Sequence, residues 1–309
     1  MAGTLKPDES ATKGIRRLAC RQVSKALAEA CKGSDHGAAL SSEVVHSVRK
    51  RLKRTRALLR LVRDALGSAV YHRENESYRD AARPLTEVRD AEVLIQTFDQ
   101  FVRRLGRDPQ PLAAIRAALA TQKDEACRQV FQRQEAREPI CESLQAGLDR
   151  IDDWPRTGRS WSVLASGIKR VYRSGQDACA AAHKSPSNEH LHQWRKQAKY
   201  LRYQLEALRP VWPLVIDELV GRMKTLGDRL GEDHDLAVLR ARLDDEQAFP
   251  ERKLTGDLQH TIDLRRDELQ QQAREVGEPF FKPRPKVLVA HLEECWHLWR
   301  AKPRAMAEA

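Results

Sequence analysis

The sequence is poor in the residues that form strands and tight turns. Its 309 residues include only 15 glycines and 14 prolines, and aromatic side chains make up 6%. Alanine, leucine, arginine, glutamate, glutamine and lysine recur throughout, and most of these favour helices over strands. An all-β or collagen-like fold is therefore excluded, and we predict an all-α protein.

Long apolar runs are also missing. No uncharged apolar stretch approaches the ~20 residues that a membrane-spanning helix needs. The first ten residues lack the apolar segment of a secretory signal. We therefore expect a cytoplasmic protein with no membrane among its partners.

The cysteines are few and scattered, with no Cys-x-x-Cys motif. Such spacing suits reduced, buried thiols better than a disulfide framework or a zinc site, so we expect no disulfide and no metal. The six residues are Cys20, Cys31, Cys127, Cys141, Cys179 and Cys295.

Acidic residues are outnumbered, because 44 Asp and Glu face 55 Lys and Arg, which leaves a formal net charge of +11. This excess indicates an anionic partner: nucleic acid, an acidic membrane surface or a phosphate polymer.

Apolar residues recur at helical spacing along almost the whole chain. The clearest interruption is the segment 152–160, which contains aspartates, a proline and a glycine. We predict a first helical bundle over 10–151, a linker at 152–159, a second bundle over 160–301, and flexible ends at 1–9 and 302–309. The predicted helices are 10–32, 41–66, 70–105, 110–150, 160–184, 188–209, 213–245, 251–276 and 286–301.

The two halves resemble each other at three places in the same order. Residues 14–17 (Gly-Ile-Arg-Arg) match 167–170 (Gly-Ile-Lys-Arg), and a His-x-x-Arg-Lys-x-x-Lys-x-x-Arg motif occurs at 46–56 and again at 192–202. An Asp-x-x-Val-Leu motif at 90–94 recurs at 235–239, preceded by Arg89 and His234. This order indicates an internal duplication, and we predict two antiparallel four-helix bundles related by a pseudo-twofold axis.

The repeated motif forms a cationic stripe on each of two helices. Residues 49–63 contain eight Lys and Arg and no acidic residue. On a helix these cations share one face, whereas Val48, Leu52 and Leu59 lie opposite. Unpaired like charges destabilise a helix by a few tenths of a kcal/mol per pair, so we expect a bound anion to offset the repulsion.

The candidate phosphate ligands are the histidine, arginine, lysine and tyrosine side chains on the polar faces of these helices. Basic residues at the other places where the two halves match are further candidates. Histidines among cations should be neutral in the unliganded protein and take up protons on binding, so affinity should rise as the pH falls from about 8 to 6. The candidates are Arg17, His46, Arg49, Lys50, Lys53, Arg56, Arg79, Arg83, Arg89, Arg170, His192, Arg195, Lys196, Lys199, Arg202, Tyr203, Lys224 and His234.

Two further features concern glycine and aspartate. The sequence Leu-Gly-x-x-Leu-Gly at 226–231 predicts a close helix crossing rather than a phosphate-cradling loop. Two roles stay open for Arg89 and His234. Each forms an ion pair with the aspartate that follows it, Asp90 or Asp235, which orients the cation, or each contacts the ligand directly.

These motifs together resemble the CHAD family, the conserved-histidine α-helical domain, over about residues 10–300. The resemblance implies a duplicated four-helix-bundle fold whose basic surfaces form a central cavity that binds inorganic polyphosphate, and an association with polyphosphate granules. Some members are fused to a triphosphate-tunnel domain. This sequence lacks the Glu-x-Glu-x-Lys strand of that domain and therefore resembles a stand-alone member.

The prediction is therefore non-catalytic binding of polyphosphate, with long chains preferred because only these can span both stripes, and without a cofactor. One alternative is a metal-dependent phosphohydrolase of HD type built on His192, Asp233, His234, Asp235 and Asp263. The other is nucleic-acid binding, which we expect to be weak and non-specific because no aromatic residue accompanies the first stripe and no Asn or Gln is placed to recognise bases.

Overall fold

The computed structural model describes residues 3–32, 39–106, 110–155, 160–245, 249 and 252–301. These residues form an all-α protein, with 87% helix and no strand among them, which confirms the predicted fold class. None of the described helices is both long and apolar enough to cross a membrane. The predictions for 302–309, and part of the predicted linker at 156–159, lie outside the described residues.

The first half of the chain contains more helix breaks than predicted. The prediction of one helix over 70–105 is wrong, because one helix ends at Ala81 and another begins at Pro84. The expected helix 110–150 is also interrupted, by a π-helical turn at Arg128–Arg133. The elements are α1 (Ala11–Ala30), α2 (Ser42–Leu61), α3 (Arg63–Leu66), α4 (Ser68–Ala81), α5 (Pro84–Leu105), a 3-10 turn (Gln110–Leu112), α6 (Ala113–Cys127), α7 (Arg137–Arg150) and a 3-10 turn (Ile151–Asp153).

The second half has longer helices. Residues 213–242 form one unbroken helix. The corresponding segment of the first half lies 145 residues earlier, which is the offset between the Asp90 and Asp235 motifs, and it is divided into α4 and α5. Pro84 explains the difference, because proline inside a helix removes a hydrogen bond and clashes with the preceding turn. The elements are α8 (Ser162–Lys184), α9 (Asn188–Leu208), a 3-10 turn (Arg209–Val211), α10 (Pro213–Arg242), α11 (Arg252–Phe281) and α12 (Pro285–Ala301).

The two motif helices, α2 and α9, begin in the same way. The Ser41 hydroxyl accepts a hydrogen bond from the Val44 amide, and the Ser187 hydroxyl accepts one from the His190 amide. Each cap satisfies an otherwise unpaired amide at the helix start. The caps therefore fix where each cationic stripe begins.

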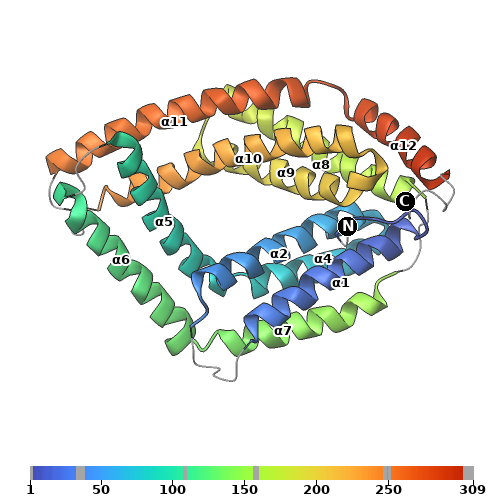
Figure 1. Cartoon of the computed structure of the whole chain (residues 1–309), viewed down its shortest axis with the longest axis horizontal. Coiled ribbons are helices and arrows are strands. Elements are labelled where there is room, and N and C mark those ends of the chain that lie inside the picture. Colours follow the sequence, from blue (N-terminus) through green and yellow to red (C-terminus); the bar gives the residue numbers. More distant parts are fainter. Residues whose placement is uncertain are drawn as a thin grey trace.

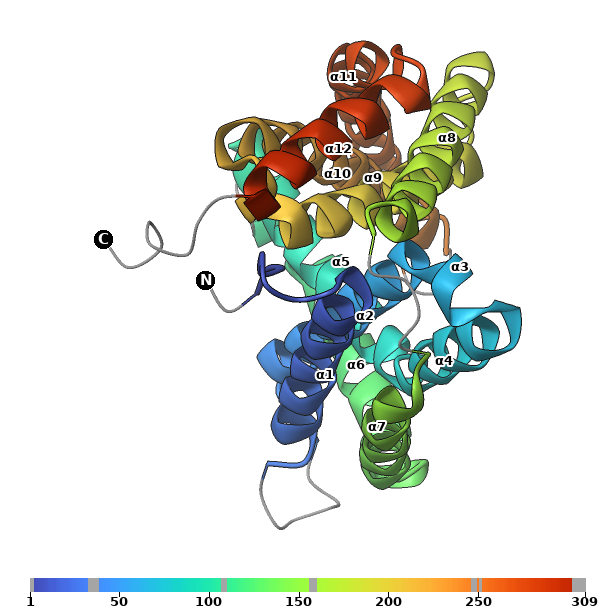
Figure 2. The same ribbon diagram turned by 90° about the vertical axis from the view of Figure 1, so that its right-hand side faces the viewer.

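The two halves pack against each other along α2 and α9 (Figures 1 and 2). Helix α5 leaves the first half and contacts α10, and α6 then runs back toward α7 (Figure 1). One apolar cluster runs through both halves, from Leu59 in α2 to Leu201 in α9. A second cluster joins α5 and α6 to α10 and α11. The halves therefore share their cores instead of each having its own.

The segment 3–9, expected to be flexible, packs against the rest of the chain. Leu5 is buried and its amide donates to the Ala207 carbonyl oxygen at 3.0 Å. Glu9 is also buried and pairs with Arg17.

The expectation of six reduced cysteines is wrong, because Cys31 and Cys141 form a disulfide with their Cα atoms 6.0 Å apart. They are separated by 110 residues and meet because the end of α1 lies beside the start of α7. The burial prediction also fails in part, since Cys179 is buried but Cys20 is exposed.

Candidate functional site

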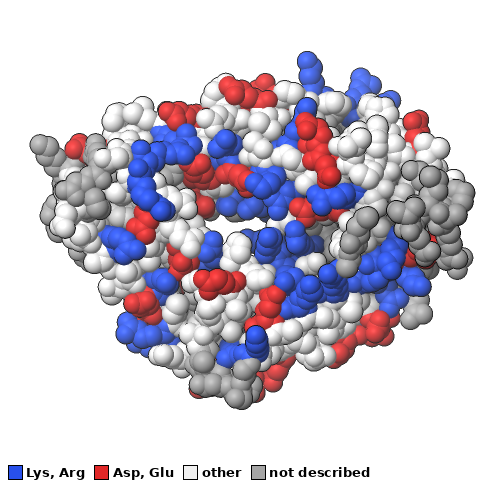
Figure 3. Space-filling view, in the orientation of Figure 1, with Lys and Arg blue, Asp and Glu red and all other residues white. Residues whose placement is uncertain are grey.

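The cationic stripes of α2 and α9 come together between the two halves of the molecule. Figure 3 shows Lys and Arg gathered in a band between the lower helices, α1 and α2, and the upper helices, α9 and α10. The predicted apolar faces are buried, with Leu52 and Leu59 on α2 and Leu201 on α9 almost inaccessible to solvent. Burial of these faces turns the charged faces toward the space between the halves.

Lys53 and Lys199 occupy corresponding positions of the repeated motif, and the charge of Lys53 lowers the pKa of Lys199. Desolvation and neighbouring arginines lower the pKa of Lys199 from 10.5 to about 7, and that of Lys53 to about 8. Neither ammonium group forms an ion pair within the described residues. Lys53 is nevertheless accessible to solvent, so it lines an open hollow.

Arg49 and Arg195, also equivalent in the motif, flank the two lysines. Arg49 Nη1 donates to the Ala82 carbonyl oxygen at 3.0 Å and to Thr86 Oγ1 at 2.5 Å. Arg195 lies against Gly231, where a Cβ atom would stand 3.2 Å from Arg195 Nη2. The Nε atoms of both arginines are buried without a hydrogen-bond partner in the described structure.

The predicted close helix crossing at 226–231 occurs where α10 packs on α9. A Cβ atom at Gly227 would lie 3.7 Å from Lys199 Cγ, and Gly231 meets Arg195 as described above. The two glycines let the side chains of Arg195 and Lys199 run close to the α10 backbone. This crossing therefore places the second cationic stripe.

Two aspartates lie among these cations. Asp235 Oδ1 is 3.9 Å from Arg195 Nη1, and desolvation raises the pKa of Asp235 despite the nearby Arg195 and Lys199. Asp90 interacts electrostatically with Arg49 and Lys53. Each aspartate thus acts on the arginine and lysine of the motif helix, rather than on the residue before it in sequence.

The histidines are close to the same cations. The His192 and His234 rings are 4.9 Å apart. Desolvation, then His234 and the neighbouring cations, lower the pKa of His192 to about 4. Desolvation and Arg89 lower the pKa of His46. These lowered pKa values favour the neutral form of both rings, in the direction expected from the neighbouring cations.

A third group of cations lies further along α2. Arg56 Nε and Arg60 Nη1 both donate to Asn75 Oδ1, at 3.1 and 3.0 Å. The Arg60 guanidinium also covers the Tyr200 ring, 4.2 Å from its centroid. Desolvation and the charges of Arg60 and Arg56 lower the pKa of Lys196. The stripe therefore continues across the α2–α9 contact.

Each of the two lysines lines a pocket. The first-half pocket, about 190 Å³, is lined by Arg49, Leu52, Lys53, Arg56, Tyr78, Arg79, Ala82, Arg83 and Thr86. The second-half pocket, about 480 Å³, is lined by Thr97, Gln100, Phe101, Arg103, Arg104, Arg195, Lys199, Gly227, Asp228, Gly231, Glu232, Asp235 and Leu236. Arg103 and Arg104 were not predicted, since they lie at the end of α5 outside any repeated motif.

Several predicted residues have other partners. Arg17 pairs with Glu9, and Arg170 pairs with Asp64. Tyr203 is buried beneath Arg54 and Arg202, and Arg202 pairs with Glu206. Lys224 is exposed and paired with Asp228. None of these five predicted residues lines either pocket, although Asp228, the partner of Lys224, lines the second one. Lys50 is exposed on α2 between Arg49 and Lys53 and lines neither pocket.

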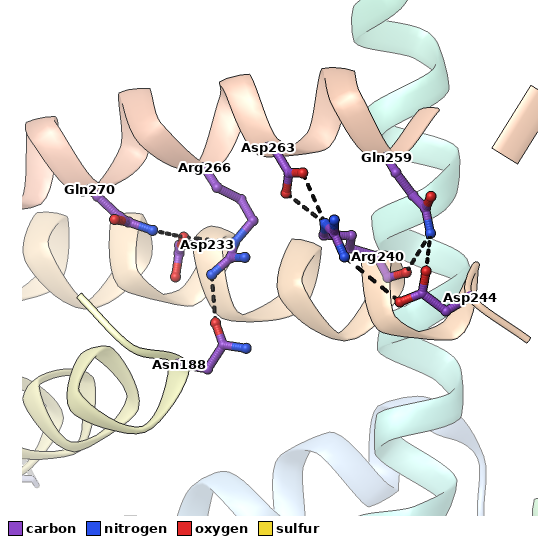
Figure 4. A network of polar contacts seen from close by, with 8 residues as sticks. All are labelled: Asn188, Asp233, Arg240, Asp244, Gln259, Asp263, Arg266 and Gln270. Atoms are coloured by element: carbon purple, nitrogen blue, oxygen red, sulfur yellow. Dashed lines mark hydrogen bonds and ion pairs between the residues drawn. The ribbon is translucent and has the colours of Figure 1, made fainter. Parts of the chain in front are cut away.

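The opposite side of α10 is held by a polar network (Figure 4). Asp233 Oδ1 accepts from Arg266 at 3.1 Å and from Gln270 at 3.0 Å, while Arg240 pairs with Asp263 at 2.7 Å. These contacts fasten α11 to α10 and pair both Asp233 and Asp263 with arginine side chains. Within the described residues no three His, Cys, Asp or Glu side chains gather in a way that could hold a metal ion.

The sequence pattern of the CHAD domain matches residues 7–244, which is more than half of the chain. The chain belongs to the CHAD domain family. The crystal structure of the CHAD domain from the plant Ricinus communis matches it with a TM-score of 0.62 and 16% identity, over 96% of this chain and 95% of that one. That likeness supports the CHAD fold alone. A comparison with curated proteins finds no match.

Proposed function

We propose that this CHAD domain binds inorganic polyphosphate, without catalysis, between its two halves. The binding surface, called the groove below, consists of the cationic stripes of α2 and α9 and the two pockets beside them. The observation that carries the proposal is the clustering of Lys53 and Lys199 with Arg195, because both lysines lack an ion-pair partner in the described chain and both have a lowered pKa. Such a cluster is costly without an anion, and a phosphate chain supplies one charge after another along its length. The family's general association with polyphosphate supports the same ligand.

The side chains of the groove suit a flexible polyanion. The guanidinium groups of Arg49 and Arg195 line the two pockets, where guanidinium groups can donate hydrogen bonds to phosphate oxygens. The lysines act as mobile point charges. Because cations come from both halves, a long chain that binds one stripe meets the second intramolecularly, with a gain in avidity of roughly 10² to 10⁴.

The placement of the acidic residues favours binding over hydrolysis. The phosphohydrolase alternative needs Asp233 and Asp263 near His192 and His234, but both carboxylates pair with arginines on the α11 side of α10 (Figure 4). Arg89 also takes the position that corresponds to His234 in the first half, and a guanidinium cannot ligate a metal. We therefore propose that the protein is not an enzyme.

Nucleic acid is a weaker candidate because the aromatic rings near the groove are already covered. Arg60 lies over the Tyr200 ring and Arg63 lies over the Tyr71 ring, at 4.2 and 4.8 Å from the centroids. Single-stranded nucleic acids usually bind through open aromatic faces on which bases stack. We expect only weak, non-specific binding of DNA, and we propose that the protein acts in the cytoplasm at polyphosphate granules.

Calorimetric titration with long-chain polyphosphate, with and without EDTA, tests the proposal. Affinity should fall by orders of magnitude between 50 and 200 mM salt if about six or more phosphates are contacted. EDTA should not change binding, and no orthophosphate should appear. Steady release of orthophosphate that EDTA abolishes would contradict the proposal and favour the hydrolase.

Charge-reversal variants test the groove itself. A triple Glu variant in either stripe should bind far more weakly, whereas a triple variant on exposed lysines outside the pockets should change affinity only slightly. The first-stripe variant changes Arg49, Lys50 and Lys53. The second-stripe variant changes Arg195, Lys196 and Lys199. The matched control changes Lys13, Lys169 and Lys184, which are exposed on α1 and α8. Equal losses in all three variants would show that only the net charge matters.

A further inference from the structure

The two pockets differ in charge although they flank equivalent lysines. The first-half pocket is lined by five cations and by no carboxylate. Its cations are Arg49, Lys53, Arg56, Arg79 and Arg83. In the second-half pocket, four cations are accompanied by the carboxylates of Asp228, Glu232 and Asp235. The first pocket therefore attracts a multiply charged anion more strongly than the second.

The first-half pocket is also the smaller of the two. Its volume of about 190 Å³ is the space of about six water molecules, enough for one or two phosphate groups. The buried side chains of Leu52 and Tyr78 line it beside the cations, and the Tyr78 hydroxyl donates to the Gly147 carbonyl oxygen. The pocket therefore has room for only a short piece of a phosphate chain.

The cations of the pocket are held in different ways. Arg49 is anchored at Ala82 and Thr86, and Arg56 at Asn75. Arg83 is exposed and forms no side-chain hydrogen bond or ion pair within the described residues. The nearest carboxylate in sequence, Asp80, pairs with Arg79 and does not line the pocket. The pocket thus combines anchored donors with an exposed one that has no hydrogen-bond or ion-pair partner within the described residues.

The end of a phosphate chain differs chemically from its interior. A terminal phosphate group has three non-bridging oxygens and carries up to two negative charges near neutral pH, because its last ionisation has a pKa of about 6. An internal group has two such oxygens and one charge. A small pocket with several guanidinium groups and no carboxylate suits the terminal group, since each guanidinium can donate to two oxygens.

We propose that the first-half pocket binds the terminal phosphate of a polyphosphate chain, while the following groups pass Lys53 and Lys199 into the second-half pocket. This inference rests on the proposed function and adds a direction to it. The protein then recognises chain ends, not only charge density, so that a linear phosphate binds better than a ring of the same charge.

The test compares linear tetraphosphate with cyclic hexametaphosphate, each of which carries about six negative charges above neutral pH. Both should compete with labelled long-chain polyphosphate at low salt, and the linear compound should compete at least tenfold better. Arg83→Ala should reduce this linear-to-cyclic ratio to within about threefold. Arg103→Ala, in the second-half pocket, is the matched control and should weaken both competitors equally. Circular dichroism checks that both variants fold.

The outcomes separate this inference from the proposed function. Equal competition by the linear and cyclic compounds, with long chains still bound tightly, would overturn end recognition and leave polyphosphate binding intact. A ratio that falls equally in the Arg83 and Arg103 variants would overturn the assignment to the first-half pocket. Failure of long chains to bind the unmodified protein at low salt would overturn the proposed function itself.

Discussion

Lys199 is the side chain whose replacement most directly tests the electrostatics of the groove. Desolvation, Arg195 and Lys53 lower its pKa from 10.5 to about 7, and Asp235 only partly opposes them. The charged form is therefore destabilised in the folded protein, by up to about 5 kcal/mol when 1.36 kcal/mol is taken per pKa unit. This destabilisation is fully present below pH 7 and disappears as the pH rises from 7 to 10.5.

Lys199→Met removes the charge while keeping an unbranched side chain of similar length. At pH 6 the variant should be more stable than the unmodified protein by up to about 5 kcal/mol, and the difference should shrink steadily above pH 7. Chemical denaturation at pH 6, 8 and 10 measures it. Lys169→Met, on the exposed face of α8, is the control and should change stability little at any pH.

The same variant should lose much of the pH dependence of ligand binding. With a pKa of about 7, Lys199 is about 90% protonated at pH 6 and about 10% at pH 8 in the unliganded protein. If bound phosphate keeps it protonated, the ratio of wild-type to Lys199→Met affinity should fall about tenfold between these pH values. Taking the ratio cancels the titration of the ligand. A ratio constant to within twofold, together with unchanged stability at pH 6, would refute the reasoning.

Three further predictions concern single sites. Gly167→Ala should destabilise the protein by about 2 to 4 kcal/mol in denaturant unfolding, because its Cβ atom would lie 2.1 Å from the Leu61 carbonyl oxygen; Gly221→Ala on α10, with no atom within 4 Å, should stabilise it by about 1 kcal/mol. Cys31→Ser should lower the unfolding free energy of the oxidised protein by up to about 5 kcal/mol and should have little further effect under reducing conditions. Polyphosphate should raise the pKa of His192 well above its unliganded value of about 4, as followed by NMR; an unchanged pKa would place the ring outside the bound anion's reach.

The sequence predicted the local features of the motif helices because they depend on spacing alone. The 3.6-residue period separates Leu52 and Leu59 from the cations, and both faces lie where the period places them. The distinction between buried and solvent-facing sides needed no knowledge of the partner helix. The break at Pro84 was also visible in the sequence, but the apolar spacing on both sides suggested one helix.

Tertiary contacts account for the predictions that failed or could not be made. Arg17 and Arg170 match in the repeat, but Glu9 and Asp64 reach them from other segments. The helical period places Tyr203 beside the polar face of α9, but Arg54 of α2 covers it. Spacing along one helix cannot reveal what another helix brings to it. The proximity of Lys53 on α2 to Lys199 on α9 also arises from the packing of two helices, so the spacing within either helix could not predict it.

The two half-sites differ most where one helix of the first half is broken and its counterpart is not. At the end of α4, the Ala82 carbonyl oxygen lies outside a continuous helix and accepts hydrogen bonds from Arg49 and Thr86. Gly227 and Gly231 follow Ala82 and Thr86 by 145 positions. Both lie within the unbroken α10, where the backbone carbonyl groups accept hydrogen bonds within the helix. Arg195 therefore lacks the anchor that Arg49 has, and lies near Asp235 instead. Because Pro84 creates the break, a single proline contributes to the difference between a smaller pocket without a carboxylate and a larger one of mixed charge.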